Sequence, residues 1–137
     1  MPLFYADASA LVKAVLEELE SDALKVFLVE AELISCELVL AEVPRAIRRG
    51  VADDPRLPLD DLLARADDAL APLALIELDN QLLTSAGALG EPGLRTLDAI
   101  HVAAALTVAE LAAFVTYDER QAAAARLAGI RTVAPGS

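Results

Sequence analysis

Short apolar segments alternate with amphipathic segments along nearly the whole chain, and this alternation constrains the fold more than any other feature. The apolar segments have the length of strands and occupy residues 3–6, 32–35, 73–78, 113–117 and 131–134. The intervening segments carry apolar residues at helical spacing. Strands that alternate with helices predict a mainly parallel sheet of four to five strands with helices on both faces. The expected class is a three-layer α/β fold.

Capping and helix-breaking residues suggest where the helices begin and end. The expected helices occupy residues 9–20, 22–31, 38–49, part of 51–73, 80–89, 97–111 and 119–129. Pro44 is expected to bend the third helix and Gly50 to end it. Asp118 is a candidate N-cap for the last helix, with Gln121 three residues later as in a capping box.

Length and composition favour one globular domain. The chain has 137 residues and is 56% hydrophobic, which is enough to bury a core. A single cysteine, Cys36, excludes an internal disulfide and fits a reducing compartment. No cationic segment precedes an apolar one at the N-terminus, so we expect no signal peptide and a cytoplasmic location. The apolar run 99–117 contains His101 and Glu110, so we expect no membrane span.

The charge balance limits the possible partners. A net charge of −11 excludes non-specific attraction to nucleic acid, so any such role needs a local basic patch or a bound metal ion. Part of the acidity lies in the fourth expected helix, at Asp60, Asp61, Asp67 and Asp68. Their seven-residue spacing around leucines is typical of a solvated helix face.

Two acidic residues share one position relative to the strands. Asp7 follows segment 3–6 and Asp118 follows segment 113–117, so both lie at the carboxyl end of a strand, where parallel sheets bind ligands. Asp98 lies in the first turn of the helix before the second of these strands, and the pattern does not by itself place it at the same edge. Glu42 lies one turn into the helix that follows the second strand.

Each acid taken alone has a structural explanation. Asp7 and Asp118 could cap helices, Asp98 could interact with a helix dipole, and Glu42 could pair with Arg45 or Arg49. Together they suggest more, because two carboxylates about 5 Å apart repel by about 3 kcal/mol at an effective dielectric of about 20. Hard divalent cations relieve such repulsion and prefer oxygen ligands. No spacing of Cys and His suggests zinc.

Four segments of the chain, in order and spacing, resemble the motif blocks of a known family. They are YADASALVK, LVLAEVPRAIRR, LRTLDAIHVAAAL and FVTYDERQAAAARLAGIRTVAPG. They are similar to those of PIN-domain ribonucleases and, more narrowly, of the VapC toxins of toxin–antitoxin pairs. The resemblance extends from about residue 4 to 136 and implies a single PIN domain over residues 1–137.

The resemblance also implies a site. Its acidic catalytic pocket would consist of Asp7, Glu42, Asp98 and Asp118. Asp7 and Asp98 would bind Mg²⁺ or Mn²⁺ directly, and Glu42 and Asp118 directly or through water. Ser9 and Thr116 match hydroxyl positions beside that pocket.

The function implied by the resemblance is a Mg²⁺- or Mn²⁺-dependent endoribonuclease that acts as a toxin. It would hydrolyse structured RNA such as tRNA or rRNA, leave 5′-phosphate and 3′-hydroxyl ends, and inhibit translation. A VapB-like antitoxin would bind it, and it would form a homodimer through its N-terminal half. The residues Leu11, Val15, Leu19, Leu24 and Leu28 could supply the dimer face or belong to the core.

Substrate contacts need cations near the acidic edge. By position the candidates are Lys13, Arg45, Arg95 and Arg120. His101 lies one turn after Asp98, but its apolar neighbours favour a core or interface histidine over a general base.

Three other functions remain open on the sequence. A receiver-like phosphoacceptor domain also places acids at the edge of a parallel sheet, but it would need paired acids after the first strand. A non-catalytic binding module would use the acids only for capping and solubility. A PIN nuclease outside toxin–antitoxin systems, or one directed at DNA, would share the same pocket, because both nucleic acids contain phosphodiesters.

Overall fold

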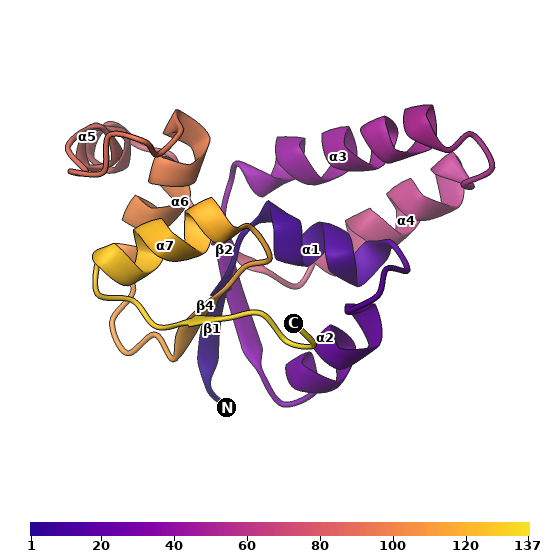
Figure 1. The fold of residues 1–137 in the computed structure, drawn as a ribbon, viewed down its shortest axis with the longest axis horizontal. Helices are drawn as coiled ribbons and strands as arrows, with labels where there is room; N and C mark the ends of the chain where they lie inside the picture. Colours follow the sequence, from indigo (N-terminus) through magenta and orange to yellow (C-terminus); the bar gives the residue numbers. More distant parts are fainter.

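The computed structural model describes residues 1–137 and contains one sheet of five parallel strands. The strands are β1 (Leu3–Ala6), β2 (Glu32–Cys36), β3 (Ala74–Ile76), β4 (Ala113–Val115) and β5 (Thr132–Val133). They lie in the order β3-β2-β1-β4-β5, and every neighbouring pair is parallel. The expected parallel α/β class is confirmed (Figure 1).

Seven helices cover the sheet in two layers. The connections from β1 to β3 contain α1 (Ala8–Val15), α2 (Ser21–Leu28), α3 (Val39–Asp53) and α4 (Leu59–Leu70). The chain then returns past β1 through α5 (Asn80–Gly87) and α6 (Thr96–Leu106), and α7 (Glu119–Leu127) precedes β5. Because crossovers keep one handedness, reversing direction along the sheet moves the helices to its other face. Figure 1 shows this separation, with α1 to α4 apart from α5 to α7.

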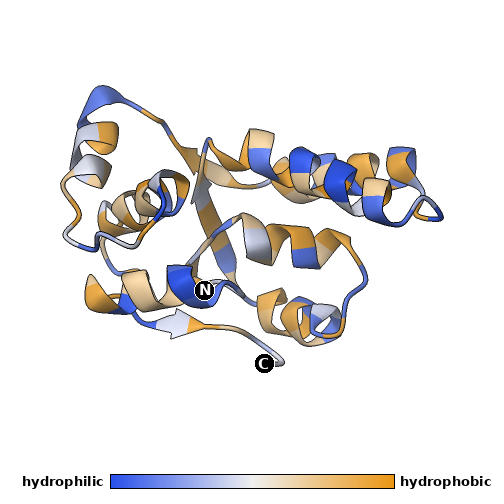
Figure 2. Ribbon diagram, turned by 45° about the horizontal axis from the view of Figure 1, so that its top comes forward, coloured by the Kyte–Doolittle hydropathy of each residue, from blue (hydrophilic) through white to orange (hydrophobic).

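Alternate residues of the central strands enter two different cores. Phe4 and Ala6 of β1 pack with α1, α3 and α4, whereas Tyr5 packs with α5, α6 and α7. In β4, Phe114 faces the same layer as Tyr5. Burial on both faces explains why the strand segments are almost wholly apolar. Figure 2 shows largely hydrophobic central strands between helices of mixed polarity.

Three helix ends differ from the predictions by four residues or more. Helix α3 continues through Gly50 to Asp53, because Gly50 packs near Leu16 and Val51 is partly buried against the core. Helix α1 ends at Val15 rather than at residue 20. Just after this end, the Ser21 hydroxyl donates to the Leu16 carbonyl at 2.8 Å. At Gly50 a tertiary contact overrides the local pattern, and at the end of α1 a side chain-to-backbone bond does so.

The third difference is at the end of α6, which stops at Leu106 instead of residue 111. The Thr107 hydroxyl donates to the Ala104 carbonyl at 2.7 Å, and Glu110 adopts a positive φ of 59°. A side chain that bonds to the backbone in this way competes with helix continuation. No helix in the structure has the length and apolar character needed to cross a membrane.

The apolar residues considered for a dimer face belong mainly to the core. Three of the five are buried: Leu11, Val15 and Leu24. Leu28 is partly buried against the same core, and Leu19 is 95% exposed. Val26 of α2 and its C-cap residue Val29 are exposed instead, three residues apart and each 75% exposed. The core alternative is therefore confirmed for the three buried residues.

Candidate active site

The strand order reverses between β1 and β4, and the predicted site lies at the carboxyl ends of these two strands. They are direct neighbours, with Ala6 opposite Val115. Asp7 continues the pairing, since its N–H donates to the Val115 carbonyl at 3.3 Å. A crevice forms at such a reversal in open α/β sheets, and ligands bind there.

Asp7 is a buried carboxylate held by three donors. The Ser9 hydroxyl and the Ala10 N–H donate to Oδ1 at 2.6 and 3.1 Å, and the Thr116 hydroxyl donates to Oδ2 at 2.5 Å. Asp7 therefore caps α1. Burial raises its pKa, and the hydroxyl donors only partly offset this. Both predicted hydroxyl residues contact Asp7, which fixes the direction of its carboxylate.

Asp118 caps α7, as expected. Its Oδ1 accepts the N–H groups of Arg120 and Gln121 at 2.9 and 3.2 Å. The predicted capping box does not form, because the Gln121 amide donates to the Asp98 carbonyl at 3.2 Å instead. This contact ties α7 to the first turn of α6 and brings Asp118 close to Asp98.

Asp98 has no capping role. The N-cap position of α6 is Arg95, and no side chain caps this helix. Burial raises the pKa of Asp98, the charges of Asp118 and Glu42 raise it further, and those of His101 and Arg95 oppose the increase. The first turn of α6 thus reaches the same edge as the other acids, which the sequence pattern alone did not require.

Glu42 pairs with His101, not with Arg45 or Arg49. Its Oε1 lies 2.6 Å from His101 Nε2, and the ring is only 2% exposed, so the prediction of a core histidine is confirmed. Burial alone would lower the pKa of His101, but hydrogen bonds to Cys36 and Glu42 and the negative charge of both raise it to about 10.

The four acids share one edge of the sheet without forming a closed cage. No group of three or more His, Cys, Asp or Glu side chains is close enough to hold a metal ion in these conformations. The charges of Glu42 and Asp118 raise the pKa of Asp98, while the Asp7 carboxylate accepts hydrogen bonds from the Ser9 and Thr116 hydroxyls. The donor set nevertheless fits a hard divalent cation, because it consists of carboxylate oxygens whose mutual repulsion such an ion would relieve.

A cavity of about 690 Å³ opens beside these acids, between α1 and α3. Its residues near the acids are Ser9, Glu42, Leu97 and Tyr117, and its cations are Lys13, Arg45 and Arg49. We call this cavity the α1–α3 groove. It joins the acidic edge to a basic wall in an otherwise acidic protein.

The three cations of the groove differ in their partners. Lys13 is bound by Glu18 and Glu20 at 2.9 and 2.7 Å and lies 4.8 Å from the centre of the Tyr117 ring. Arg45 and Arg49 take part in none of the ion pairs of the structure. Arg49 was not among the predicted contacts, although its i+4 spacing from Arg45 places both on one helix face.

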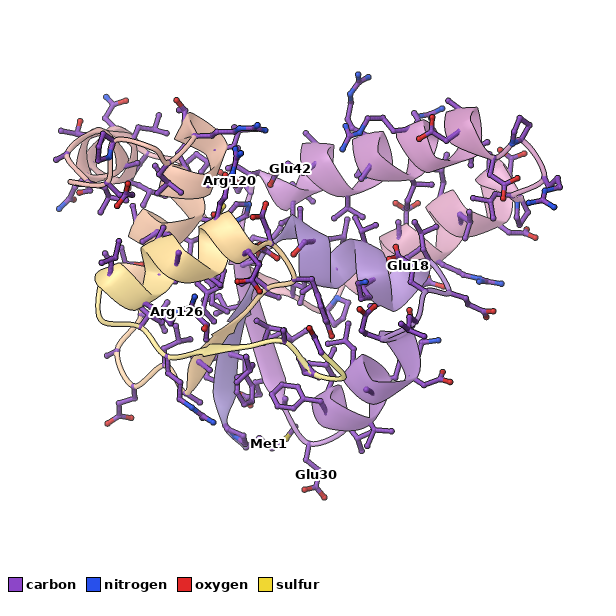
Figure 3. All side chains as sticks on the ribbon, in the orientation of Figure 1. Met1, Glu18, Glu30, Glu42, Arg120 and Arg126 are labelled. Atoms are coloured by element: carbon purple, nitrogen blue, oxygen red, sulfur yellow. The ribbon has the colours of Figure 1, made fainter.

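The other two predicted cations lie outside this groove. Arg95 lowers the pKa of Asp98 through its charge, so it lies beside the acids. Arg120 is in the first turn of α7 and lines a separate cavity with Glu91 and Leu94. Figure 3 shows Arg120 and Glu42 at one end of the molecule and Met1 at the opposite end.

Fold and site together define a parallel α/β protein with carboxylates at the point where strand order reverses, and comparisons identify its family. The PIN domain model matches residues 4–127. The chain belongs to the PIN domain family. It is 40% identical to ribonuclease VapC35 of Mycobacterium tuberculosis, over 98% of each chain. It is 38% identical to ribonuclease VapC46 of the same organism, over 98% of this chain and 99% of that one.

Solved structures share the fold at low sequence identity. The crystal structure of VapC20 of Mycobacterium tuberculosis, described as a sarcin–ricin loop cleaving toxin, matches with a TM-score of 0.72 at 16% identity. The match covers 96% of this chain and 99% of that one. VapBC2 of Rickettsia felis, bound to a DNA fragment from its promoter, matches with a TM-score of 0.69 at 15% identity, over 97% and 98% of the chains.

The strand order contradicts one alternative function. Receiver-like phosphoacceptor domains have the order 2-1-3-4-5, whereas this sheet has β1 between β2 and β4. Only Asp7 follows β1, so the paired acids of such domains are also missing.

Proposed function

We propose that this protein is the toxin of a toxin–antitoxin pair and hydrolyses RNA with Mg²⁺ or Mn²⁺ as cofactor. The observation that carries the proposal is that Asp118 and Glu42 lie close enough to Asp98 for their charges to raise its pKa. The three acids belong to three different helices or their caps. A structural role would not require three helices to bring like charges together. A cation-binding site does require it.

The four carboxylates divide into two kinds by their surroundings. Asp7 is fixed by Ser9 and Thr116, so its oxygens have a defined direction. Asp98 accepts none of those hydrogen bonds, and we assign it as the principal metal ligand beside Asp7. Asp118 uses Oδ1 for its cap and keeps Oδ2 for a metal ion or a water molecule.

A divalent ion held by these carboxylates would supply Lewis acidity, which activates water and stabilises negative charge on the phosphate. The protein's own contribution is to orient the attacking water and the substrate. Glu42 and the free oxygen of Asp118 orient that water. Arg95, beside Asp98, contacts a phosphate oxygen at the cleavage site, and Arg120 contacts the strand beyond it.

We assign the α1–α3 groove to the RNA strand. Arg45 and Arg49 supply the phosphate contacts, because neither is neutralised by an acidic side chain. Lys13 contributes less, since Glu18 and Glu20 already bind its ammonium group. Such local cations overcome the net charge of −11 over short distances, because salt screens the distant acids.

The substrate we propose is structured RNA such as tRNA or rRNA, cut to 5′-phosphate and 3′-hydroxyl ends so that translation stops. The resemblance in fold to a sarcin–ricin loop cleaving toxin supports an RNA substrate of this kind. We further propose that residues 1–137 form a single PIN domain and that the protein acts in the cytoplasm.

Two protein partners complete the proposal. One is a VapB-like antitoxin, whose counterpart occurs in the VapBC2 complex of similar fold. The other is a second copy of this chain, bound through the N-terminal half, where Val26 and Val29 are exposed at the end of α2. Exposed apolar residues that adjoin one another favour such contacts.

The test is cleavage of a structured RNA by the wild-type protein and by Asp98→Asn, with Mg²⁺ or with EDTA. We expect cleavage only by the wild type with metal. Asp67→Asn, on the exposed face of α4, is the matched control and should cleave normally. No cleavage by the folded wild type with metal would favour a non-catalytic module, equal cleavage by Asp98→Asn would contradict the role of Asp98, and faster cleavage of DNA of the same sequence would favour a DNA nuclease.

A further inference from the structure

We propose that His101 is a positioning residue for Glu42, and that Tyr5 holds the His101 ring in place. The proposal rests on the assignment of Glu42 to the active site made above. It gives a role to a buried polar group that the proposed reaction does not otherwise use.

Three side chains from three elements form a continuous hydrogen-bonded chain. Tyr5 of β1 contacts His101 Nδ1 through its hydroxyl at 2.7 Å, and His101 Nε2 contacts Glu42 Oε1 at 2.6 Å. Tyr5 is fully buried and His101 is 2% exposed, whereas the side chain of Glu42 is 21% exposed and lines the α1–α3 groove. The chain therefore begins in the core and ends at the proposed active site.

The direction of the bond to Glu42 does not depend on the protonation state of the ring. A carboxylate only accepts hydrogen bonds, so Nε2 must carry its hydrogen toward Glu42. With one ring proton, Nδ1 accepts from the Tyr5 hydroxyl; with two, Nδ1 donates to the hydroxyl oxygen. In either state His101 presents a donor to Oε1 and leaves Oε2 of Glu42 for the pocket.

The contact also joins the two helix layers. His101 lies on α6, which packs in the core with Tyr5 and Phe114, while α3 packs on the opposite face of the sheet. The bond between their side chains passes beyond the carboxyl ends of the strands. An apolar residue at position 101 would fill the core without the cost of burying an imidazole, so the polar ring indicates a role beyond packing.

Without His101, Glu42 would have other partners. Arg45 lies three residues later on α3, and Arg49 lines the same groove. A glutamate that turned toward Arg45 would leave the metal site and neutralise a cation assigned to RNA. His101 prevents both by holding Oε1 of Glu42 toward α6.

A general-base role for His101 does not fit this geometry. Both ring nitrogens are occupied, by Tyr5 and Glu42, and the Cys36 sulfur lies 3.7 Å from Nδ1. A ring that is 2% exposed has no face open to a water molecule or to substrate.

The test uses His101→Met, which removes the donor at similar volume, and His101→Gln, which keeps an N–H donor near the position of Nε2. Mn²⁺ affinity is measured by calorimetry without RNA, and kcat and KM are measured with RNA. We expect His101→Met to weaken Mn²⁺ binding, to lower kcat by about 10- to 100-fold, and to raise KM because a released Glu42 neutralises Arg45. His101→Gln should recover most of both losses.

A double-mutant cycle separates positioning from general damage. In a Glu42→Ala background, His101→Met should cause no further loss of kcat, because its only route of action is gone. Val102→Ala, the next buried residue on α6, is the control that lowers stability while Mn²⁺ affinity and kcat stay at wild-type values. Tyr5→Phe removes the hydroxyl that holds the His101 ring and keeps the core filled, so it should also lower kcat. It takes the place of His101→Met if that variant does not fold.

Wild-type Mn²⁺ affinity and kcat in His101→Met, or in Tyr5→Phe where His101→Met does not fold, would overturn the positioning role and leave the nuclease proposal intact. Additive losses of kcat from Glu42→Ala and His101→Met in the cycle would also overturn the positioning role. Absence of Mn²⁺ binding by the wild-type protein would instead contradict the proposed function, and with it the role of His101.

Discussion

Thr116 at the end of β4 donates its hydroxyl hydrogen to Asp7 at the end of β1, at 2.5 Å across 109 residues of chain. The Thr116 oxygen in turn accepts the Asp118 N–H at 3.1 Å. One hydroxyl thus connects two of the four predicted acids at the point where the strand order reverses. The geometry of the site depends on the pairing of these two strands, so changes to such connections should alter activity more than distant surface changes.

Replacing Thr116 by valine tests this connection, because valine keeps the shape and removes the hydroxyl. Asp7 is 5% exposed, so an unpaired Oδ2 should cost about 2 kcal/mol of unfolding free energy at neutral pH. RNA cleavage should fall by about tenfold or more. Chemical denaturation and a cleavage assay measure the two effects. Thr132→Val, on β5, is the control, and equal losses in both variants would contradict a specific role for Thr116.

Replacing Asp98 by asparagine should abolish cleavage but stabilise the metal-free protein at neutral pH. The charges of Asp118 and Glu42 disfavour an ionised Asp98, and asparagine removes that repulsion. A gain of about 1 kcal/mol is expected, typical of substitutions that remove an unfavourable functional group. Thermal unfolding in EDTA measures it, and a lower melting temperature for the variant would contradict the account.

The same substitution has a predicted pH dependence. The folded-state pKa of Asp98 is raised above its unfolded value, so its stabilising contribution is present at pH below the unfolded value and is lost as pH rises through the folded value. The stability difference between Asp98→Asn and the wild type should therefore be largest at neutral pH and shrink on acidification. Denaturation at a series of pH values tests this. A difference that grows on acidification would show that the pKa of Asp98 is lowered.

Replacing Arg45 or Arg49 by glutamine should weaken RNA binding without changing the fold. Each lost phosphate contact should reduce the slope of log affinity against log salt by about 0.7 for a single-stranded segment. Binding to a metal-free, uncut RNA at several salt concentrations gives that slope. Arg56→Gln, in an exposed pair with Asp54, is the control. An unchanged slope in Arg45→Gln and Arg49→Gln would remove the α1–α3 groove as the path of the RNA.

Replacing Val26 by aspartate should dissociate the proposed homodimer. Val26 is 75% exposed on α2, so the substitution places a charge in the contact without disturbing the core. Sedimentation velocity should show a wild-type dimer and a variant monomer with equal melting temperatures at low concentration. A wild type that stays monomeric at high concentration would contradict the dimer.

The sequence allowed the sheet and the positions of Asp7 and Asp118 to be predicted, because both follow from local patterns. A short, wholly apolar segment such as 3–6 is typical of a strand buried on both faces of a parallel sheet. An acid directly after such a strand must lie at its carboxyl end. The position of Asp98 depended on how loop 87–96 returns the chain, which no local pattern specifies. The resemblance to the PIN domain family, and not a local pattern, predicted that Asp98 lies with the other acids.

The misplaced helix ends depend on contacts that the helical pattern does not show. Gly50 remains helical because Leu16, distant in sequence, packs near it, whereas α1 ends early where Ser21 bonds to the nearby Leu16 carbonyl. The bond between Glu42 and His101 joins residues 59 positions apart, and Arg45 and Arg49 offered nearer partners for Glu42. Such choices depend on the packing of α3 and α6, so a one-dimensional pattern does not contain them.

The central claim is that the carboxylates at this edge of the sheet bind a divalent cation. Calorimetric titration of Mn²⁺ into the metal-free wild-type protein and into Asp98→Asn tests it most directly, with RNA and antitoxin absent. The account predicts saturable binding by the wild type and a loss of at least tenfold in affinity for the variant, while both remain folded. Equal affinities, or no heat of binding to the folded wild type, would contradict it.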